Sequence, residues 1–171
     1  MEAPQFPVSP RPKDEELPPR EEQIKLIEKA PQALREAVKD LSDAQLDTKY
    51  KNWTIRQIVH HLADSHAHSY IRFKWALTED KPVIKAYDET KWNDLEDSKK
   101  GSVEGPLAMS EGIHKQWAQL LRSMTEEQFN RAFIHPEGNR VVTLKGALGT
   151  YAWHGRHHTG AILWMRENKK V

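Results

Sequence analysis

Residues 54–77 read TIRQIVHHLADSHAHSYIRFKWAL, and this segment carries a helix-start signal together with four of the nine histidines of the chain. Thr54 and Gln57 have the spacing of a capping box, in which the two side chains satisfy free amides of the first turn. Polar positions are supplied by Arg56, Asp64 and Lys74, and the apolar face comprises Ile55, Ile58, Val59, Leu62, Ile71 and Phe73. We therefore predict an amphipathic helix from Thr54 to about Leu77 that turns one stripe toward a core.

The same periodicity predicts further helices on either side of this segment. Upstream, apolar residues recur at alternating spacings of three and four: Ile24, Ile27, Pro31, Leu34, Val38 and Leu41. Pro106 suits the first turn of another helix, whose apolar positions are Leu107, Ile113, Trp117, Leu120, Leu121 and Met124. Thr125 and Gln128 cap a short segment, and Thr143 is a candidate cap for a last long helix that reaches roughly Asn168. Four long helices predict an all-α fold, a four-helix bundle with a crossover connection.

The segments outside these helices differ in composition from the predicted bundle. Residues 78–105 are rich in charge and long for a connection, so we expect a lid, a dimer contact or an irregular crossover there. Six of the ten prolines fall within the first 19 residues, and we predict that residues 1–18 form a proline-rich arm that is extended over the domain or partly disordered. Residues 19–171 would then form the single domain that a chain of 171 residues indicates.

Composition excludes several classes of function. With 26 Lys and Arg against 25 Asp and Glu, the formal charge is +1, which argues against nucleic-acid binding. The apolar runs are far shorter than the ~20 residues that span a membrane, and the N-terminus lacks the pattern of a secretory signal, so we expect a cytoplasmic protein. Cysteine is absent, which excludes disulfides, thiolate metal sites and a cysteine nucleophile. Any metal must therefore be held by His, Asp or Glu.

Seven of the nine histidines fall in two windows, one on each of two predicted helices. His154 and His158 are separated by ~40° around a helix axis and ~6 Å along it, so both imidazoles can reach one ion. His158 lies in an apolar seam and points inward, where an unpartnered imidazole costs desolvation energy. His61, beside Ile58 and Leu62, is the preferred third ligand. Three neutral imidazoles with open coordination positions suit Zn²⁺ or Ni²⁺.

The other histidines receive different interpretations. His68 shares a face with His61 but lies ~10 Å further along the axis, too far to ligate the same ion. We expect His66 and His68 to be exposed, His60 and His157 to support the ligands or lie at the surface, and His114 and His135 to be structural or solvated. None of these six is predicted to be a metal ligand.

Hydrolytic chemistry at such a site needs an activated water and a group that moves a proton. Zinc ligation lowers the pKa of bound water to near ~7, or polarises a carbonyl or phosphoryl oxygen of a substrate. Asp64 lies close to His61 in the sequence and could orient an imidazole or accept a proton; an ordinary salt bridge is the alternative. The chain has no H-E-x-x-H motif of zincin proteases and no G-x-S-x-G nucleophile elbow.

Two stretches carry a family resemblance: NWT at 52–54 followed by RQIVHHLADSH at 56–66, and YAWHGRHH at 151–158. They are similar to the DinB/YfiT-like superfamily, in particular to its YfiT group of metal-dependent hydrolases, from about residue 19 to residue 167. The resemblance implies an up-down-down-up four-helix bundle, a homodimer, and one zinc or nickel ion per chain with His61, His154 and His158 as ligands. Relatives often carry a further His or Gln one turn beyond the final ligand, where this chain has Ala161. We therefore expect the surroundings of the site to differ from theirs.

Three functions follow from these observations. The first is a metal-dependent hydrolase of a small molecule, in which the three histidines hold the ion, activated water attacks, and Asp64 or His157 assists proton movement. The second is suggested by thiol-dependent members of the superfamily, namely bacillithiol S-transferases and a maleylpyruvate isomerase. In it, the site activates a low-molecular-weight thiol such as bacillithiol, and the absence of cysteine is consistent with an external thiol. The third is a non-catalytic metal-binding dimer, which a fourth protein ligand closing the coordination shell would favour.

Overall fold

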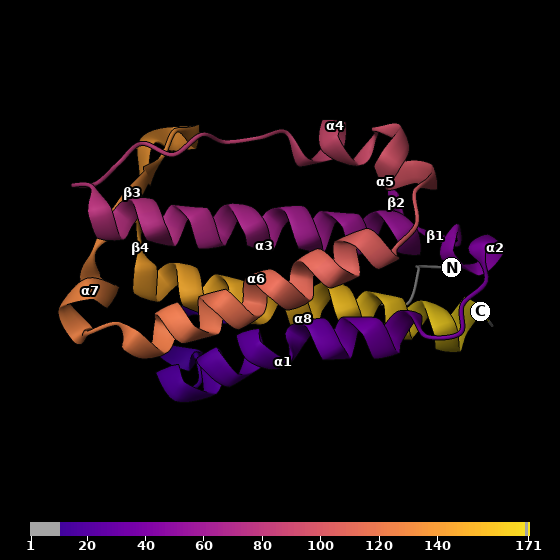
Figure 1. Ribbon diagram of the computed structural model, residues 1–171, viewed down its shortest axis with the longest axis horizontal. Coiled ribbons are helices and arrows are strands. Elements are labelled where there is room, and N and C mark those ends of the chain that lie inside the picture. Colours follow the sequence, from indigo (N-terminus) through magenta and orange to yellow (C-terminus); the bar gives the residue numbers. More distant parts are fainter. Residues whose placement is uncertain (1–10, 170) are drawn as a thin grey trace.

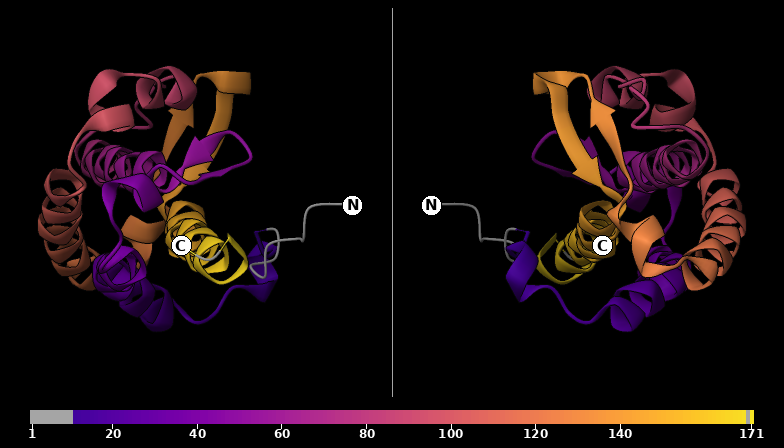
Figure 2. Two further views of the ribbon diagram at one scale, coloured as in Figure 1. Left: turned by 90° about the vertical axis from the view of Figure 1, so that its right-hand side faces the viewer. Right: turned by 90° about the vertical axis from the view of Figure 1, so that its left-hand side faces the viewer.

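Four long helices dominate the computed structural model, which describes residues 11–169 and 171. They are α1 (Arg20–Val38), α3 (Ile55–Thr78), α6 (Glu104–Ser123) and α8 (Leu144–Lys169). Helices α1 and α8 run in one direction and α3 and α6 in the other, which gives the up-down-down-up order (Figure 1). Each helix packs on two others, in the order α1, α6, α3, α8 around the bundle (Figure 2). The predicted all-α four-helix bundle is confirmed.

The starts of α3 and α8 form as their side chains predict. The Thr54 hydroxyl accepts a hydrogen bond from the Gln57 amide, and the Gln57 side chain accepts one from the Thr54 amide. The Thr143 hydroxyl accepts a hydrogen bond from the Gly146 amide in the first turn of α8. These bonds satisfy amides that a helix leaves free at its N-terminus, so the predicted helix starts are correct.

Because α3 and α6 are parallel, the chain between them must return along the whole length of the bundle. This crossover contains two short helices, α4 (Glu89–Asn93) and α5 (Glu96–Lys100), which lie over α3 (Figure 1). The Gln57 side-chain amide donates a 2.8 Å hydrogen bond to the carbonyl of Asn93, which ties α4 to the start of α3. The predicted crossover is present, but it is more regular than its charged sequence indicates.

Two small antiparallel hairpins, two short α-helices and two short 3₁₀ helices complete the described part of the domain. Strands β1 (Lys49–Tyr50) and β2 (Trp53–Thr54) form one hairpin, and β3 (Ala132–His135) and β4 (Arg140–Thr143) form the other, with Ala132 opposite Thr143. The short elements are α2 (Asp43–Leu46), α7 (Glu126–Asn130), η1 (Asp14–Glu16) and η2 (Glu137–Asn139). Strands of two to four residues leave too short an alternating pattern to be found by periodicity, so the sequence pattern does not predict them.

The proline-rich arm lies partly outside the described residues. Its described part, residues 11–18, contacts α8: the Arg11 guanidinium donates a 2.9 Å hydrogen bond to the Thr150 hydroxyl. The side chain of Leu17 occupies the space that a Cβ atom at Gly149 would need. This close approach explains a glycine within α8, where it destabilises the helix by ~1 kcal/mol relative to alanine.

The core consists of two apolar clusters with buried polar residues between them. One cluster includes Leu34, Ile58, Leu62, Leu107 and Ile162, and the other includes Ile27, Phe73, Trp117, Leu121 and Leu148. On α3 and α6 the buried polar residues that separate the clusters are His66, Ser69, Ser110 and His114. Thus α3 and α6 both place a buried serine and a buried histidine between the two apolar clusters.

Two predictions for α3 are wrong. Ile71, assigned to the apolar face, is 42% exposed; it is two residues from Phe73, and two residues correspond to ~200° around a helix, so the two cannot share one stripe. Arg56, assigned to a polar position, is only 3% exposed. Its guanidinium donates hydrogen bonds of 2.9 and 3.0 Å to the carboxylates of Asp47 and Asp43, and one of 2.8 Å to the carbonyl of Gly101.

Arg56 is therefore expected to be a major contributor to stability. We predict that Arg56→Met, which keeps the volume but removes the donors, lowers the free energy of unfolding by about 2–3 kcal/mol. Asp43→Asn is the matched control, because this carboxylate is 90% exposed and its loss should cost at most ~1 kcal/mol. Urea unfolding monitored by circular dichroism measures both values, and equal effects of the two substitutions would contradict the prediction.

Candidate metal centre

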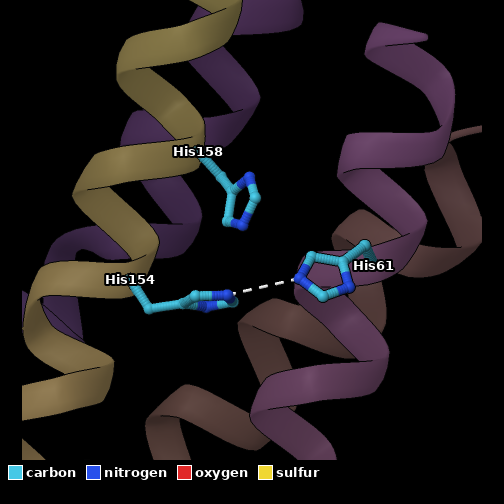
Figure 3. Close-up of side chains that lie close together, drawn as sticks. All are labelled: His61, His154 and His158. Carbon is cyan, nitrogen blue, oxygen red and sulfur yellow. Dashed lines mark hydrogen bonds between the residues drawn. The ribbon is translucent and has the colours of Figure 1, made fainter. Parts of the chain in front are cut away.

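The three histidines predicted as ligands meet between α3 and α8. His61 comes from α3, and His154 and His158 come from successive turns of α8 (Figure 3). The Nε2 atoms of His61 and His154 are 3.2 Å apart, and one nitrogen from each of the three rings lies within 4.8 Å of the others. Two antiparallel neighbouring helices thus bring together residues more than 90 positions apart in the sequence.

The spacing and chemistry of these nitrogens fit a divalent ion. Zinc binds imidazole at ~2.0–2.1 Å, and two such ligands at a tetrahedral angle lie about 3.3 Å apart. Burial lowers the pKa of His61 to about 4. Burial, followed by the nearby histidines, also lowers the pKa of His154 and of His158. All three rings are therefore neutral at pH 7 and keep a lone pair for a metal ion.

A pocket of about 290 Å³ opens beside these histidines. It is lined by Lys51, Asn52, Trp53, Ile58, Glu89, Thr90, His157, His158 and Ala161. The β1–β2 hairpin holds Trp53 against the site, with its ring centroid 4.5 Å from that of His61 and 6.1 Å from that of His158. A small molecule in this pocket would lie against one of the candidate ligands and an indole face.

The two residues predicted to assist catalysis occupy different places. His157 lines the pocket, with its ring centroid 5.1 Å from that of His158 and 4.7 Å from that of Trp153. Asp64 is half-buried on α3 and is not among the residues that line the pocket. Burial raises the pKa of its carboxyl group, and repulsion from Asp97 adds to this effect, whereas His68 lowers the pKa. Of the two, His157 is better placed to meet a bound molecule.

The structure corrects the expectation that His66 and His68 are exposed. His66 is only 2% exposed, and its Nε2 lies 3.2 Å from Nδ1 of His154. His68 is partly buried, its ring stacking on Tyr87 with centroids 4.2 Å apart. The position of His66 was readable from the sequence, because Leu62, His66, Ser69 and Phe73 have the spacing of one buried stripe.

His114 was predicted to be either structural or solvated, and it is structural. It contacts His66, which in turn contacts the candidate ligand His154. It is 3% exposed, and its Nε2 lies 2.9 Å from Nδ1 of His66. His114 follows the buried Leu107 and Ser110 and precedes Trp117 at helical spacing. Periodicity could therefore have predicted its burial, but not its contact with His66, which lies 48 residues away.

Fold and site together define a four-helix bundle with a candidate three-histidine centre. A family model described as the DinB superfamily matches residues 26–162, and the chain belongs to this superfamily. It is 49% identical over 141 residues to the Bacillus subtilis (strain 168) protein named "Putative metal-dependent hydrolase YfiT", a match that covers 81% of this chain and 79% of that protein. A Bacillus cereus (strain 03BB102) protein named "Putative metal-dependent hydrolase" is 51% identical over 146 residues, covering 84% and 83%.

Solved structures support the same relationship. The structure of Bacillus subtilis YfiT, described as "a probable metal-dependent hydrolase with an unusual four-helix bundle topology", superposes with a TM-score of 0.91 and 42% identity. That match covers 96% of this chain and 97% of YfiT. The mycothiol-dependent maleylpyruvate isomerase has a TM-score of 0.68 at 14% identity, covering 86% of this chain and 62% of the isomerase. At this low identity the likeness is one of fold alone.

Proposed function

We propose that this protein is a metal-dependent hydrolase that acts on a small molecule and holds one Zn²⁺ or Ni²⁺ ion through His61, His154 and His158. The observation that carries the proposal is the convergence of three neutral imidazole nitrogens beside an open pocket. The names of the Bacillus relatives agree with this reaction class. No helix in residues 11–169 is long and apolar enough to cross a membrane.

A divalent ion in this site would lower the pKa of a bound water or polarise a substrate oxygen. The chain itself supplies the binding surface and the proton transfer. Trp53 covers one side of the histidines, while Lys51 and Glu89 place opposite charges at the pocket. His157, which also lines the pocket, would accept a proton from the attacking water and return it to the leaving group. Asp64 lies on α3, the helix that carries His61, and does not line the pocket. Its role would be to help orient the His61 imidazole rather than to contact the substrate.

The experiment that tests the function is an activity screen of metal-free and reconstituted protein. Esters, amides and phosphoesters form one arm, and a low-molecular-weight thiol with an electrophile forms the other. The proposal requires hydrolysis that depends on the ion and is lost in His154→Ala, whereas His68→Ala, on the same helix as His61 but outside the centre, keeps it. Turnover confined to the thiol arm would replace the hydrolase by a thiol transferase. A wild type that binds the ion but turns over neither set would indicate a non-catalytic metal-binding protein.

Trp53 provides a direct signal for occupation of the site. Because its ring lies 4.5 Å from that of His61, we expect titration of metal-free protein with Co²⁺ to quench part of the tryptophan fluorescence and to saturate at one ion per chain. Trp53→Phe should bind Co²⁺ with affinity within about threefold of the wild type, as measured by calorimetry, but lose most of the quenching. Trp153 also lies near the centre, with its ring centroid 6.4 Å from that of His154, so undiminished quenching in a Trp53→Phe/Trp153→Phe double variant would place the ion elsewhere.

The homodimer and the cytoplasmic location are parts of the same proposal. Analytical ultracentrifugation of the full chain, with and without the ion, tests the first. Sedimentation at twice the chain mass of 19.8 kDa would support a dimer.

A further inference from the structure

A chain of imidazoles connects the candidate ligand His154 to the backbone of α1. The Nδ1 atom of His114 lies 2.5 Å from the carbonyl oxygen of Ile27. The Nε2 atom of His114 lies 2.9 Å from Nδ1 of His66, and Nε2 of His66 lies 3.2 Å from Nδ1 of His154. The contacts thus pass through all four bundle helices, from α1 to α6, α3 and α8, at the level where polar residues separate the two apolar clusters.

The direction of these hydrogen bonds follows from their starting point. A carbonyl oxygen can only accept, so Nδ1 of His114 must carry the proton that it donates to Ile27. A neutral imidazole has one N–H group and one lone pair, so Nε2 of His114 accepts from Nδ1 of His66. By the same step, Nε2 of His66 accepts from Nδ1 of His154. The Nε2 atom of His154 is then left with its lone pair, and it is this atom that faces Nε2 of His61.

Burial prevents water from changing this pattern. His66 and His114 are 2% and 3% exposed, and a buried polar group without a hydrogen bond costs about 1–3 kcal/mol. Reversing one ring in the chain would set two N–H groups or two lone pairs against each other. The single acceptor on α1 therefore determines all three tautomers.

We propose that His114 and His66 are positioning residues that hold His154 in the tautomer with the proton on Nδ1, and so keep Nε2 free to bind the ion. The opposite tautomer would place a proton on the nitrogen that must ligate. Metal-bound histidines commonly donate their other N–H group to a carbonyl or a carboxylate. Here the carbonyl is that of Ile27, and two further imidazoles transmit its effect to the ligand. The inference rests on the proposed metal site.

Metal-free protein labelled with ¹⁵N-histidine tests the direction of the hydrogen bonds between the imidazoles. Two-bond ¹H–¹⁵N correlation spectra near pH 7.5 distinguish the two neutral tautomers, and single substitutions assign the rings. We expect His114, His66 and His154 all to carry the proton on Nδ1. A proton on Nε2 of His66 or of His154 would overturn the inference. Because this measurement uses no metal, its result does not depend on whether the protein proves to be a hydrolase.

Paired substitutions at His66 test whether the chain of imidazoles affects the affinity for Zn²⁺. The amide of His66→Gln can donate to Nε2 of His114 and accept from Nδ1 of His154, whereas the ring of His66→Phe can do neither. We expect His66→Phe to weaken Zn²⁺ binding about 10–100-fold and to shift His154 toward the Nε2-protonated tautomer, and His66→Gln to restore most of the affinity. His68→Phe, on the same helix but outside the chain, should bind within about twofold of the wild type.

The outcomes separate a positioning role from a purely structural one. If His66→Phe and His66→Gln weaken binding equally while the tautomer of His154 stays the same, the residue only fills space and the inference fails. It also fails if His66→Phe keeps the affinity of the wild type. If His66→Phe does not fold, the wild-type spectra and the paired variants His114→Gln and His114→Phe decide the question, with the same order of affinities expected. A wild type that binds no ion would refute the proposed function, whereas the tautomers would still be measured.

Discussion

Loss of any one of the three imidazoles is expected to abolish stoichiometric metal binding. We predict about one divalent ion per wild-type chain after reconstitution, and a loss of affinity well above the ~100-fold typical of an outer-shell partner in His61→Ala, His154→Ala and His158→Ala. The reason is that a site with only three protein ligands cannot lose one and keep its geometry. Elemental analysis and competition with a chromophoric chelator measure the stoichiometry and the affinity.

His135→Ala is the matched control for these variants, because His135 lies on strand β3 rather than between α3 and α8. It should retain the full complement of ion. If the wild type takes up no stoichiometric ion, or if the three variants bind as tightly as the control, the three-histidine centre is wrong and the bundle would have to act without it.

Acid should destabilise the metal-free protein strongly between about pH 6.5 and pH 4. Burial depresses the pKa of His61 in the folded protein from its usual 6.5 to about 4. Above pH 6.5 the ring is neutral in both states and contributes no pH dependence. As the pH falls below 6.5 the unfolded chain takes up a proton that the folded protein excludes, so stability falls until the folded pKa is reached. For His61 alone this amounts to about 2 kcal/mol at pH 5 and about 3 kcal/mol at pH 4.

Urea unfolding at pH 7 and pH 5 in the presence of a chelator measures this loss. The buried His66 and His114 and the half-buried His154 and His158, whose pKa values desolvation also lowers, should add to it. In His61→Phe the difference in unfolding free energy between the two pH values should shrink by the ~2 kcal/mol assigned to His61. An unchanged difference in this variant would show that His61 is protonated equally in the folded and unfolded states.

Local signals in the sequence were sufficient to predict that four long helices form and to select the three candidate ligands. The capping residues at Thr54 and Thr143 act within one turn, and the pair His154 and His158 is adjacent on one helix, so neither depends on distant residues. His61 was selected because its neighbours Ile58 and Leu62 are apolar, and these residues are buried in the bundle. The up-down-down-up order came from the family resemblance, since periodicity does not specify helix direction.

The sequence interpretation failed where a residue was judged from its type rather than from its place in a stripe. His66 was expected at the surface although it continues the spacing of Leu62, and Arg56 was assigned to a polar position because it is charged. The partners of both residues are distant in the sequence or belong to short elements: His66 contacts His114 on α6, and Arg56 contacts Asp43 at the start of α2 and Asp47 at its end. A buried polar side chain is stable only with such partners, and local pattern does not reveal them.

The starts of α3 and α8 and the histidine pair of α8 follow from interactions within a few residues, and the amino-acid sequence alone specifies them; the end of α1 does not, because the apolar spacing continues to Leu41 whereas the helix ends at Val38. The convergence of His61 with that pair, the pocket beside Trp53, and the imidazole chain from His154 to Ile27 depend on how the four helices pack. Packing sets distances between atoms that are up to 105 residues apart in the contacts of the site, as between Trp53 and His158. The strength of a hydrogen bond and the fit of a metal ligand depend on differences of tenths of an ångström in the distance between two atoms. These features could therefore be established only from the folded arrangement.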